Sequence, residues 1–181
     1  RNPYETLSFF EINRNKKILE IIPGRGWYTE ILSKYMKGSE NYYVLMYGKP
    51  EIEILKKIQG DFLIFFKENK KNFGNFKNLY FDKNFNIANK DNFFDTVLTF
   101  RNSHNWLDKG KAEKVYQSLN KVLKKGGILG VVQHRNFDDS DKNFFKGYVK
   151  EQFLVELIEK QGFKLIDKSE INSNPKDKKN Y

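Results

Sequence analysis

Short apolar runs alternate with amphipathic stretches along the chain. The first run, residues 17–22, is rich in β-branched side chains and ends at Pro23-Gly24, which is typical of a buried parallel strand. Apolar residues then recur with the spacing of a helix face, and this pattern stops at Gly38. The residues of that face are Tyr28, Ile31, Leu32, Tyr35 and Met36. The N-terminal part of the chain is therefore predicted to form a strand, a tight turn and a helix.

The same alternation continues towards the C-terminus. Apolar runs predict strands at residues 42–47, 76–81, 94–100, 128–132 and 163–171, and amphipathic patterns predict helices at residues 51–58, 111–124 and 147–161. Residues 61–66 fit either a helix face or a short strand, because a brief apolar run does not reveal its period. Strands that alternate with helices predict βαβ units, and therefore a doubly wound α/β fold around a mainly parallel, Rossmann-like sheet.

A single domain is expected over residues 1–171. A chain of 181 residues usually closes one core, and no internal repeat or linker interrupts this one. Residues 172–181 are polar and charged, include Pro175, and predict a surface tail. The chain opens with Arg1 rather than Met, and we expect its N-terminus to be cut or processed.

The formal net charge of +10 bears on the choice of partner. A basic protein can bind a polyanion, but lysines are spread along this whole chain and predict no single binding face. The lysine-rich stretch at residues 67–71 is better explained as a solvated surface. We therefore expect a small-molecule substrate, with nucleic acid as the alternative partner.

Cysteine and long apolar runs are both missing from the sequence. Without cysteine, the chain has no disulfide, thiolate nucleophile or cysteine-based zinc site. No apolar run approaches the roughly 18 residues that a membrane-spanning helix needs. We therefore expect no membrane partner and a cytoplasmic protein.

Aromatic residues supply much of the expected core. They make up 16% of the chain, which is enough large apolar surface to fill the space between a sheet and its helices. Trp27 and Trp106 are both expected to be core residues rather than stacking platforms for a substrate.

The turn after residues 17–22 is a candidate ligand site. In an open parallel sheet, ligands bind beyond the carboxyl ends of the strands, near the point where strand order reverses. Gly24 and Gly26 let the backbone approach a ligand closely, and the next helix offers free N–H groups. A dinucleotide site would have a small residue in place of Thr29, and an acid for the ribose just after the strand that ends at Tyr47. Nicotinamide binding is therefore disfavoured.

Several segments share a specific likeness with one family. They are RNPYETL (1–7), LEIIPGRGWYTE (19–30), TFRNSHNW (99–106), LKKGG (123–127), VQH (132–134) and NPKD (174–177). Together they resemble the class I S-adenosylmethionine-dependent methyltransferases, and more narrowly a family of predicted bacterial methyltransferases of unknown substrate. Such enzymes usually finish with an antiparallel hairpin of strands six and seven. After residue 171 no apolar run remains, so we expect a sheet without the seventh strand and a longer native protein that supplies it.

This resemblance implies that the turn after the first strand holds S-adenosylmethionine. Glu20 occupies the place of an acid at the end of that strand, and Gly24 and Gly26 are the two glycines beside the methionine part of the cofactor. Ile22 stands where the family has its first glycine, next to Pro23 at the cofactor's edge. This substitution narrows the room beside the cofactor unless the backbone shifts.

Other positions are implied to border the remaining parts of the cofactor. Tyr28 is expected either to reach its amino-acid end or to pack in the core. The acid that normally binds the ribose hydroxyls is missing, which leaves Tyr47 or Glu51 as substitutes. Asp82 or Asn84 is expected to face the adenine. The residues implied to line the opposite wall are Phe100, Arg101 and Asn102.

Two histidines are the candidate catalytic residues. His104 follows the strand at 94–100 and His134 follows the strand at 128–132, so neighbouring strand ends would bring both to one cleft. Histidine titrates near neutral pH and can take a proton from an attacking hydroxyl or amine. The alternatives are a role in ordering the loop for His104 and in capping the strand for His134. No metal site is expected, because two histidines and nearby aspartates without a fixed ligand spacing are a weak metal signal.

Methyl transfer from a sulfonium needs few catalytic side chains, because the cofactor is already activated and the protein mainly aligns the reacting groups. The sequence therefore predicts a methyltransferase that acts on an unidentified small molecule. One alternative is a non-catalytic domain of the same fold that has lost the cofactor, which Ile22 and the missing ribose acid favour. The other is a basic protein that binds or modifies nucleic acid, which the net charge favours.

Overall fold

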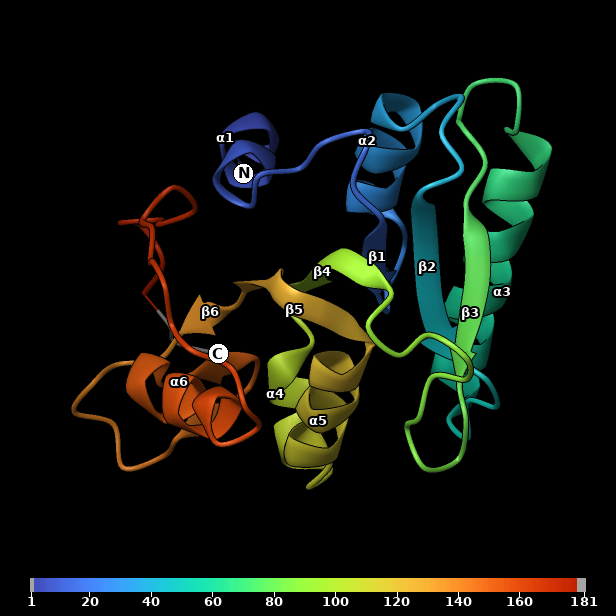
Figure 1. The fold of residues 1–181 in the computed structure, drawn as a ribbon. Coiled ribbons are helices and arrows are strands. Elements are labelled where there is room, and N and C mark those ends of the chain that lie inside the picture. The colour runs from blue at the N-terminus through green and yellow to red at the C-terminus, as the bar shows by residue number, and fades with distance from the viewer. Residues whose placement is uncertain (1, 179–181) are drawn as a thin grey trace.

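Five parallel strands form the central sheet of the computed structural model, which describes residues 2–178 (Figure 1). In sheet order they are β3 (Lys77–Phe81), β2 (Tyr42–Tyr47), β1 (Ile18–Ile21), β4 (Phe94–Phe100) and β5 (Leu123–Val132). The order reverses between β1 and β4, because the chain first adds strands on one side of β1 and then returns to its other side. The doubly wound parallel sheet predicted from the sequence is confirmed.

Helices cover both faces of the sheet (Figure 1). One face packs against α1 (Pro3–Phe9), α2 (Trp27–Tyr35) and α3 (Glu53–Glu68), and the other against α4 (Ser103–Asp108), α5 (Ala112–Val122) and α6 (Glu151–Glu159). A small second sheet follows β5 and consists of β6 (His134–Arg135), β8 (Tyr148–Val149) and β7 (Phe144–Phe145), in that spatial order. In the described part of the chain, no helix is long and apolar enough to cross a membrane.

A hydrophobic core lies on each face of the sheet. Successive residues of the inner strands belong to different cores, because the side chains of a strand alternate between the faces of its sheet. In β2, Val44 packs with α1, α2 and α3, whereas Leu45 packs with α4, α5 and α6. Ile18 and Leu19 of β1 divide in the same way. All four residues of β1 are buried, which explains why its sequence is a continuous apolar run broken by one acid.

The structure shows which of the two alternatives for residues 61–66 is correct, and it contains elements that the apolar pattern did not predict. Residues 61–66 belong to the long helix α3, which buries Phe62 and Phe66 on one side and exposes Phe65. The short elements α1, α4 and β6 to β8 were not predicted, because six or seven residues show too little periodicity to reveal a helix, and two-residue strands show none.

The strand expected at residues 163–171 is wrong. This segment has no regular secondary structure and runs along the surface, with Leu165 and Ile166 exposed. Among the described residues, β5 pairs within its sheet with β4 alone, so the segment lacks the hydrogen-bonded ladder that a strand requires. The helix expected at residues 147–161 begins later than predicted, at Glu151, because Tyr148 and Val149 are used by β8.

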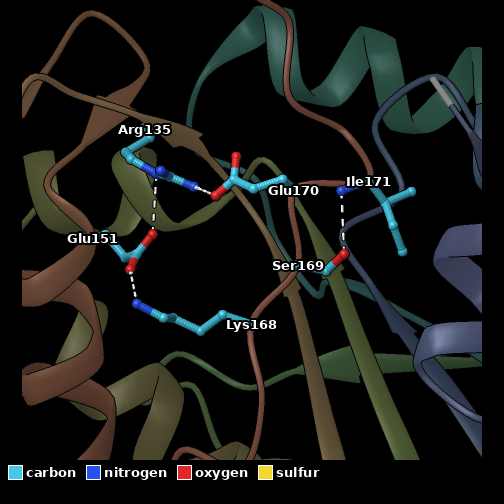
Figure 2. Close-up of polar contacts among 6 residues, drawn as sticks. All are labelled: Arg135, Glu151, Lys168, Ser169, Glu170 and Ile171. Carbon is cyan, nitrogen blue, oxygen red and sulfur yellow. Dashed lines mark hydrogen bonds and ion pairs between the residues drawn. The ribbon is translucent and has the colours of Figure 1, made fainter.

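Ion pairs connect the segment 163–171 to β6 and α6 (Figure 2). Arg135 of β6 lies between Glu151 at the start of α6, at 3.0 Å, and Glu170. Glu151 also accepts a hydrogen bond from Lys168 at 2.6 Å. Arg135 lowers the pKa of Glu170 from its ordinary value, as expected for a carboxylate that accepts from a guanidinium.

The polar tail contacts the N-terminal helix in its described part. Residues 172–178 are mostly exposed, but the Asn172 amide donates to the Thr6 hydroxyl at 2.8 Å. The Tyr148 hydroxyl donates to Asp177 at 3.0 Å. The remainder of the expected tail, residues 179–181, lies outside the described residues.

We expect the substitution Arg135→Met to loosen the segment 163–171 with little effect on the whole fold. The side chains of this network are partly exposed, and such pairs contribute up to about 1 kcal/mol to the free energy of unfolding. Hydrogen exchange followed by mass spectrometry should show faster exchange in this segment. Lys16→Met, which removes a pair with Glu11, is the control and should leave it unchanged. Unchanged exchange in Arg135→Met would show that other contacts hold the segment.

Candidate functional site

The turn after β1 lies at the point where strand order reverses, and its backbone is left-handed at three alternate residues. Ile22, Gly24 and Gly26 have φ angles of 45°, 62° and 85°. Ile22 therefore keeps the left-handed backbone that glycine adopts most easily, although a β-branched side chain there costs about 1–2 kcal/mol. Its N–H donates to the Leu45 carbonyl at 2.8 Å, which ties the turn to β2. The turn thus keeps a left-handed residue at the position where the resemblance implies a glycine.

The two glycines of the turn have different roles. A Cβ atom added to Gly24 would meet no other atom within 4 Å, so the space above this residue is open to a ligand. A Cβ atom on Gly26 would lie 2.7 Å from the Phe66 ring and 3.0 Å from the Phe62 ring. Gly26 thus lets the N-terminus of α2 pack closely on α3, while Gly24 leaves room at the carboxyl end of β1.

Glu20 is buried between β1, β2 and α2. Its Oε2 atom accepts hydrogen bonds from the Tyr42 hydroxyl at 2.5 Å and the Thr29 hydroxyl at 2.7 Å. Within residues 2–178, its Oε1 atom is buried without a hydrogen-bond partner. Burial raises the pKa of Glu20 to about 7, against the opposing effect of the two hydroxyl donors. The acid predicted at the end of the first strand therefore keeps its proton to a higher pH than an exposed carboxyl group does.

Asn102 joins the two strand ends that flank the reversal point. Its side-chain amide donates to the carbonyl of Ile21 at 3.0 Å and to the Thr99 hydroxyl at 3.1 Å, with a longer contact to the carbonyl of Ile22. The residue predicted to line the cofactor wall thus also fixes the backbone of the opposite wall. No sequence pattern indicated this cross-link, because the two segments are about eighty residues apart.

Two other residues predicted to contact the cofactor stack on each other. The rings of Tyr28 and Phe100 are nearly parallel, with centroids 3.6 Å apart and an angle of 7° between their planes. Tyr28 is buried, so the core-packing alternative describes its position. Arg101, the next residue, has a φ of 62° and donates its N–H to the Val132 carbonyl at 2.7 Å, and its side chain is exposed.

The candidates for the ribose and adenine positions lie at the ends of β2 and β3. The Tyr47 hydroxyl accepts a hydrogen bond from the indole N–H of Trp106 at 3.2 Å, and burial raises the pKa of Tyr47. Asp82 accepts three hydrogen bonds from Asn84 and Asn86, which lower its pKa and occupy its carboxylate within its own loop. Asn84 and Glu51 are exposed.

The two tryptophans differ in burial. Trp106 is buried, as expected of a core residue. Trp27 keeps 38% of its surface exposed, so its assignment to the core is wrong. The first position of α2, directly after the turn, keeps its side chain at the rim rather than beneath the sheet.

His134 lines a cavity at the carboxyl ends of β4 and β5, and His104 lies next to one residue of its wall. The cavity has a volume of about 260 Å³ and is lined by Arg101, His134, Lys146, Gly147 and Tyr148. His104 reaches its wall through Gly147, because its Nε2 atom lies 4.0 Å from the position of a Cβ atom on that glycine. Burial lowers the pKa of His104. Their catalytic roles stay a prediction, and the pattern did not indicate the other wall residues Lys146 and Tyr148.

Within residues 2–178, no group of three or more histidine, aspartate or glutamate side chains is placed to hold a metal ion.

Comparison with solved structures identifies the class of fold. A S-adenosylmethionine-dependent methyltransferase from Aquifex aeolicus matches with a TM-score of 0.68 at 20% sequence identity, over 92% of this chain and 81% of that chain. The [4+2]-cyclase SpnF matches with a TM-score of 0.66 at 16% identity, over 91% and 57%. The glycopeptide N-methyltransferase MtfA, complexed with S-adenosylhomocysteine, matches with 0.54 at 18% identity, over 79% and 53%. The chain has the fold of the class I S-adenosylmethionine-dependent methyltransferases.

The similarity to known proteins is structural and was not found at the level of sequence. No protein-family model and no curated protein matches the sequence. Identities of 16 to 20% to the solved structures establish the fold, and SpnF shows that a cyclase also uses it. The activity must therefore be argued from the site.

We expect the variant with glycine at position 22 to have a higher free energy of unfolding than the variant with alanine there. Ile22→Gly and Ile22→Ala both remove the side chain that packs on the core, but only glycine relieves the left-handed backbone. The glycine variant should be the more stable by about 1 kcal/mol, which reverses the usual order. Urea unfolding of both variants measures the difference. An alanine variant at least as stable as the glycine variant would show that the backbone is not strained.

We expect Glu20 to make the stability depend on pH. Because its pKa is about 7 in the folded chain and near 4.5 when unfolded, the folded state holds a proton that the unfolded state has lost between these values. The free energy of unfolding therefore falls as the pH rises through this window, by up to roughly 3 kcal/mol. Glutamine does not titrate, so Glu20→Gln should gain stability relative to the unaltered protein from pH 5 to pH 8.

Urea unfolding of the two proteins at each pH tests this prediction, since all other titrating groups cancel in the difference. A difference that does not change with pH would contradict it.

Proposed function

We propose that the protein transfers a methyl group from S-adenosylmethionine to a small-molecule acceptor. The observation that carries the proposal is the left-handed turn at the carboxyl end of β1, with open space above Gly24, at the reversal point of a sheet with this fold. The fold alone is compatible with other chemistry, so the turn and its surroundings must support the cofactor.

The residues around the turn fit the methionine part of the cofactor. The backbone of Gly24 can be approached closely, and the first N–H groups of α2 follow Gly26, where a carboxylate is stabilised by the helix N-terminus. Glu20 has a buried oxygen that no described residue satisfies. Gly24 and the start of α2 would hold the amino-acid end, and Glu20 would keep the turn in place beneath it.

The cofactor supplies an activated methyl group, so the protein needs mainly to align the acceptor with it. Asn102 fixes the distance between the two walls through its hydrogen bonds to the Ile21 carbonyl and to Thr99. This reaction needs walls that hold their positions, because misplacement of the reacting groups by about 1 Å greatly lowers the rate.

Two observations favour a second function, in which the domain no longer binds the cofactor. The Ile22 side chain stands where the family has glycine, and the Tyr28 and Phe100 rings stack against each other rather than facing a ligand. In that case the fold would be intact and the turn would bind nothing.

Isothermal titration with S-adenosylhomocysteine separates the two functions. We expect saturable binding by the unaltered protein and at least tenfold weaker binding by Gly24→Val, because its side chain enters the open space. Gly126→Val is the matched control: Gly126 is also left-handed with open space around it, but lies near the amino end of β5, and its substitution should leave the affinity unchanged. No heat at millimolar cofactor, from protein shown to be folded by circular dichroism, would refute the methyltransferase proposal.

A further inference from the structure

The cavity beside the two histidines lies next to the candidate cofactor turn but is not part of it. Arg101 directly follows β4, and His134 is the second residue after β5, so the cavity sits at the carboxyl ends of these two strands. Its volume of about 260 Å³ is below the roughly 300–1,000 Å³ of clefts that enclose a whole drug-sized ligand. It can therefore hold one chemical group of a ligand rather than an entire cofactor.

The wall of this cavity is cationic. Arg101 and Lys146 both line it, and His134 adds a third basic side chain, whereas no acidic side chain among the described residues does so. Within residues 2–178, no carboxylate forms an ion pair with Arg101. A described acid near the wall, Asp177, accepts a hydrogen bond from the Tyr148 hydroxyl. The positive charge of Arg101 is thus left for a ligand.

His104 lies next to Gly147, which forms part of the same wall. The side-chain amide of Gln133 donates to the Gly147 carbonyl at 2.6 Å, which fixes its nitrogen on that side, and the same nitrogen lies 3.4 Å from His104 Nδ1. Because a nitrogen that carries hydrogens faces Nδ1, Nδ1 accepts and the proton of the neutral ring sits on Nε2. Nε2 lies 4.0 Å from the position of a Cβ atom on Gly147, a residue that lines the cavity. In this tautomer Nε2 is a hydrogen-bond donor rather than a base.

We propose that this cavity binds a carboxylate or phosphate group of the methyl acceptor. The guanidinium of Arg101 can donate two parallel hydrogen bonds to such a group, and Lys146 and His134 line the same cavity. The proposal rests on the proposed function, since it places the acceptor beside the cofactor turn. It narrows the substrates to small anionic molecules.

Histidine resonances provide a direct test, because the sequence contains two histidines, of which His134 lines the cavity and His104 lies next to Gly147 in its wall. Imidazole signals in ¹H–¹³C spectra, assigned with His104→Gln, are followed while sodium phosphate or sodium acetate is added at constant ionic strength. We expect saturable shifts with at least one of the two anions. A response to phosphate alone assigns a phosphate ester, and a response to acetate alone assigns a carboxylate. Shifts that grow linearly with both anions would overturn the site.

Variants separate this site from general charge and from the cofactor's own carboxylate. Arg101→Met should weaken anion binding at least tenfold, while Lys57→Met, which removes an exposed lysine of α3, should not. Lys146→Met, which changes a cavity residue that is not among those implied to border the cofactor, should bind S-adenosylhomocysteine within twofold of the unaltered protein. A tenfold loss there would assign the cavity to the cofactor and overturn the proposal.

The two proposals fail in different ways. A protein that binds S-adenosylhomocysteine but shows linear anion shifts would refute the anion site alone. Saturable anion shifts in a protein that binds no S-adenosylhomocysteine would refute the methyltransferase function, and with it the assignment of the anion to a methyl acceptor.

Discussion

The left-handed turn after β1 is the constraint on which the candidate site depends. It is held from both neighbouring strands: the Ile22 N–H bonds to the Leu45 carbonyl on the β2 side, and the Asn102 amide bonds to the Ile21 carbonyl on the β4 side. A turn fixed at two edges cannot relax to accommodate a β-branched side chain, so the isoleucine accepts an unfavourable backbone instead. The ligand-facing edge of the sheet is therefore held by hydrogen bonds from both neighbouring strands.

The core and the site share residues to an unusual degree. The strand alternation that sends Ile18 towards α2 also sends Glu20 there, where it is buried with Thr29 and Tyr42 as partners. Gly26 is required by the packing of α2 on the α3 rings as much as by any ligand. Burial of an ionised carboxyl group lowers stability unless the group is hydrogen-bonded or protonated. Glu20 accepts two hydrogen bonds, and its raised pKa favours the protonated form. Changes at these positions would alter stability and binding together, so matched control variants are needed to read either effect.

Local patterns predicted most of the fold, whereas contacts between distant segments decided the rest. The bounds of β2 and β4 agree with their apolar runs because buried parallel strands are continuous in sequence. The segment 163–171 has an equally apolar start, but a strand needs a neighbour, and no local signal tells whether one is present. For the site, the positions of the glycine turn and of His134 at strand ends followed from the sequence. The Gln133 contact that sets the His104 tautomer and the stacking of Tyr28 on Phe100 depend on tertiary packing, which no spacing reveals.

The two residues of β6 link the C-terminal segment to the cavity. His134 lines the cavity, while the adjacent Arg135 holds the segment 163–171 through carboxylates. Attraction between partly exposed charges weakens as dissolved ions screen it, over a Debye length of about 8 Å at physiological ionic strength. A change in ionic strength would therefore act on the contacts of a residue that is directly bonded to one lining the cavity.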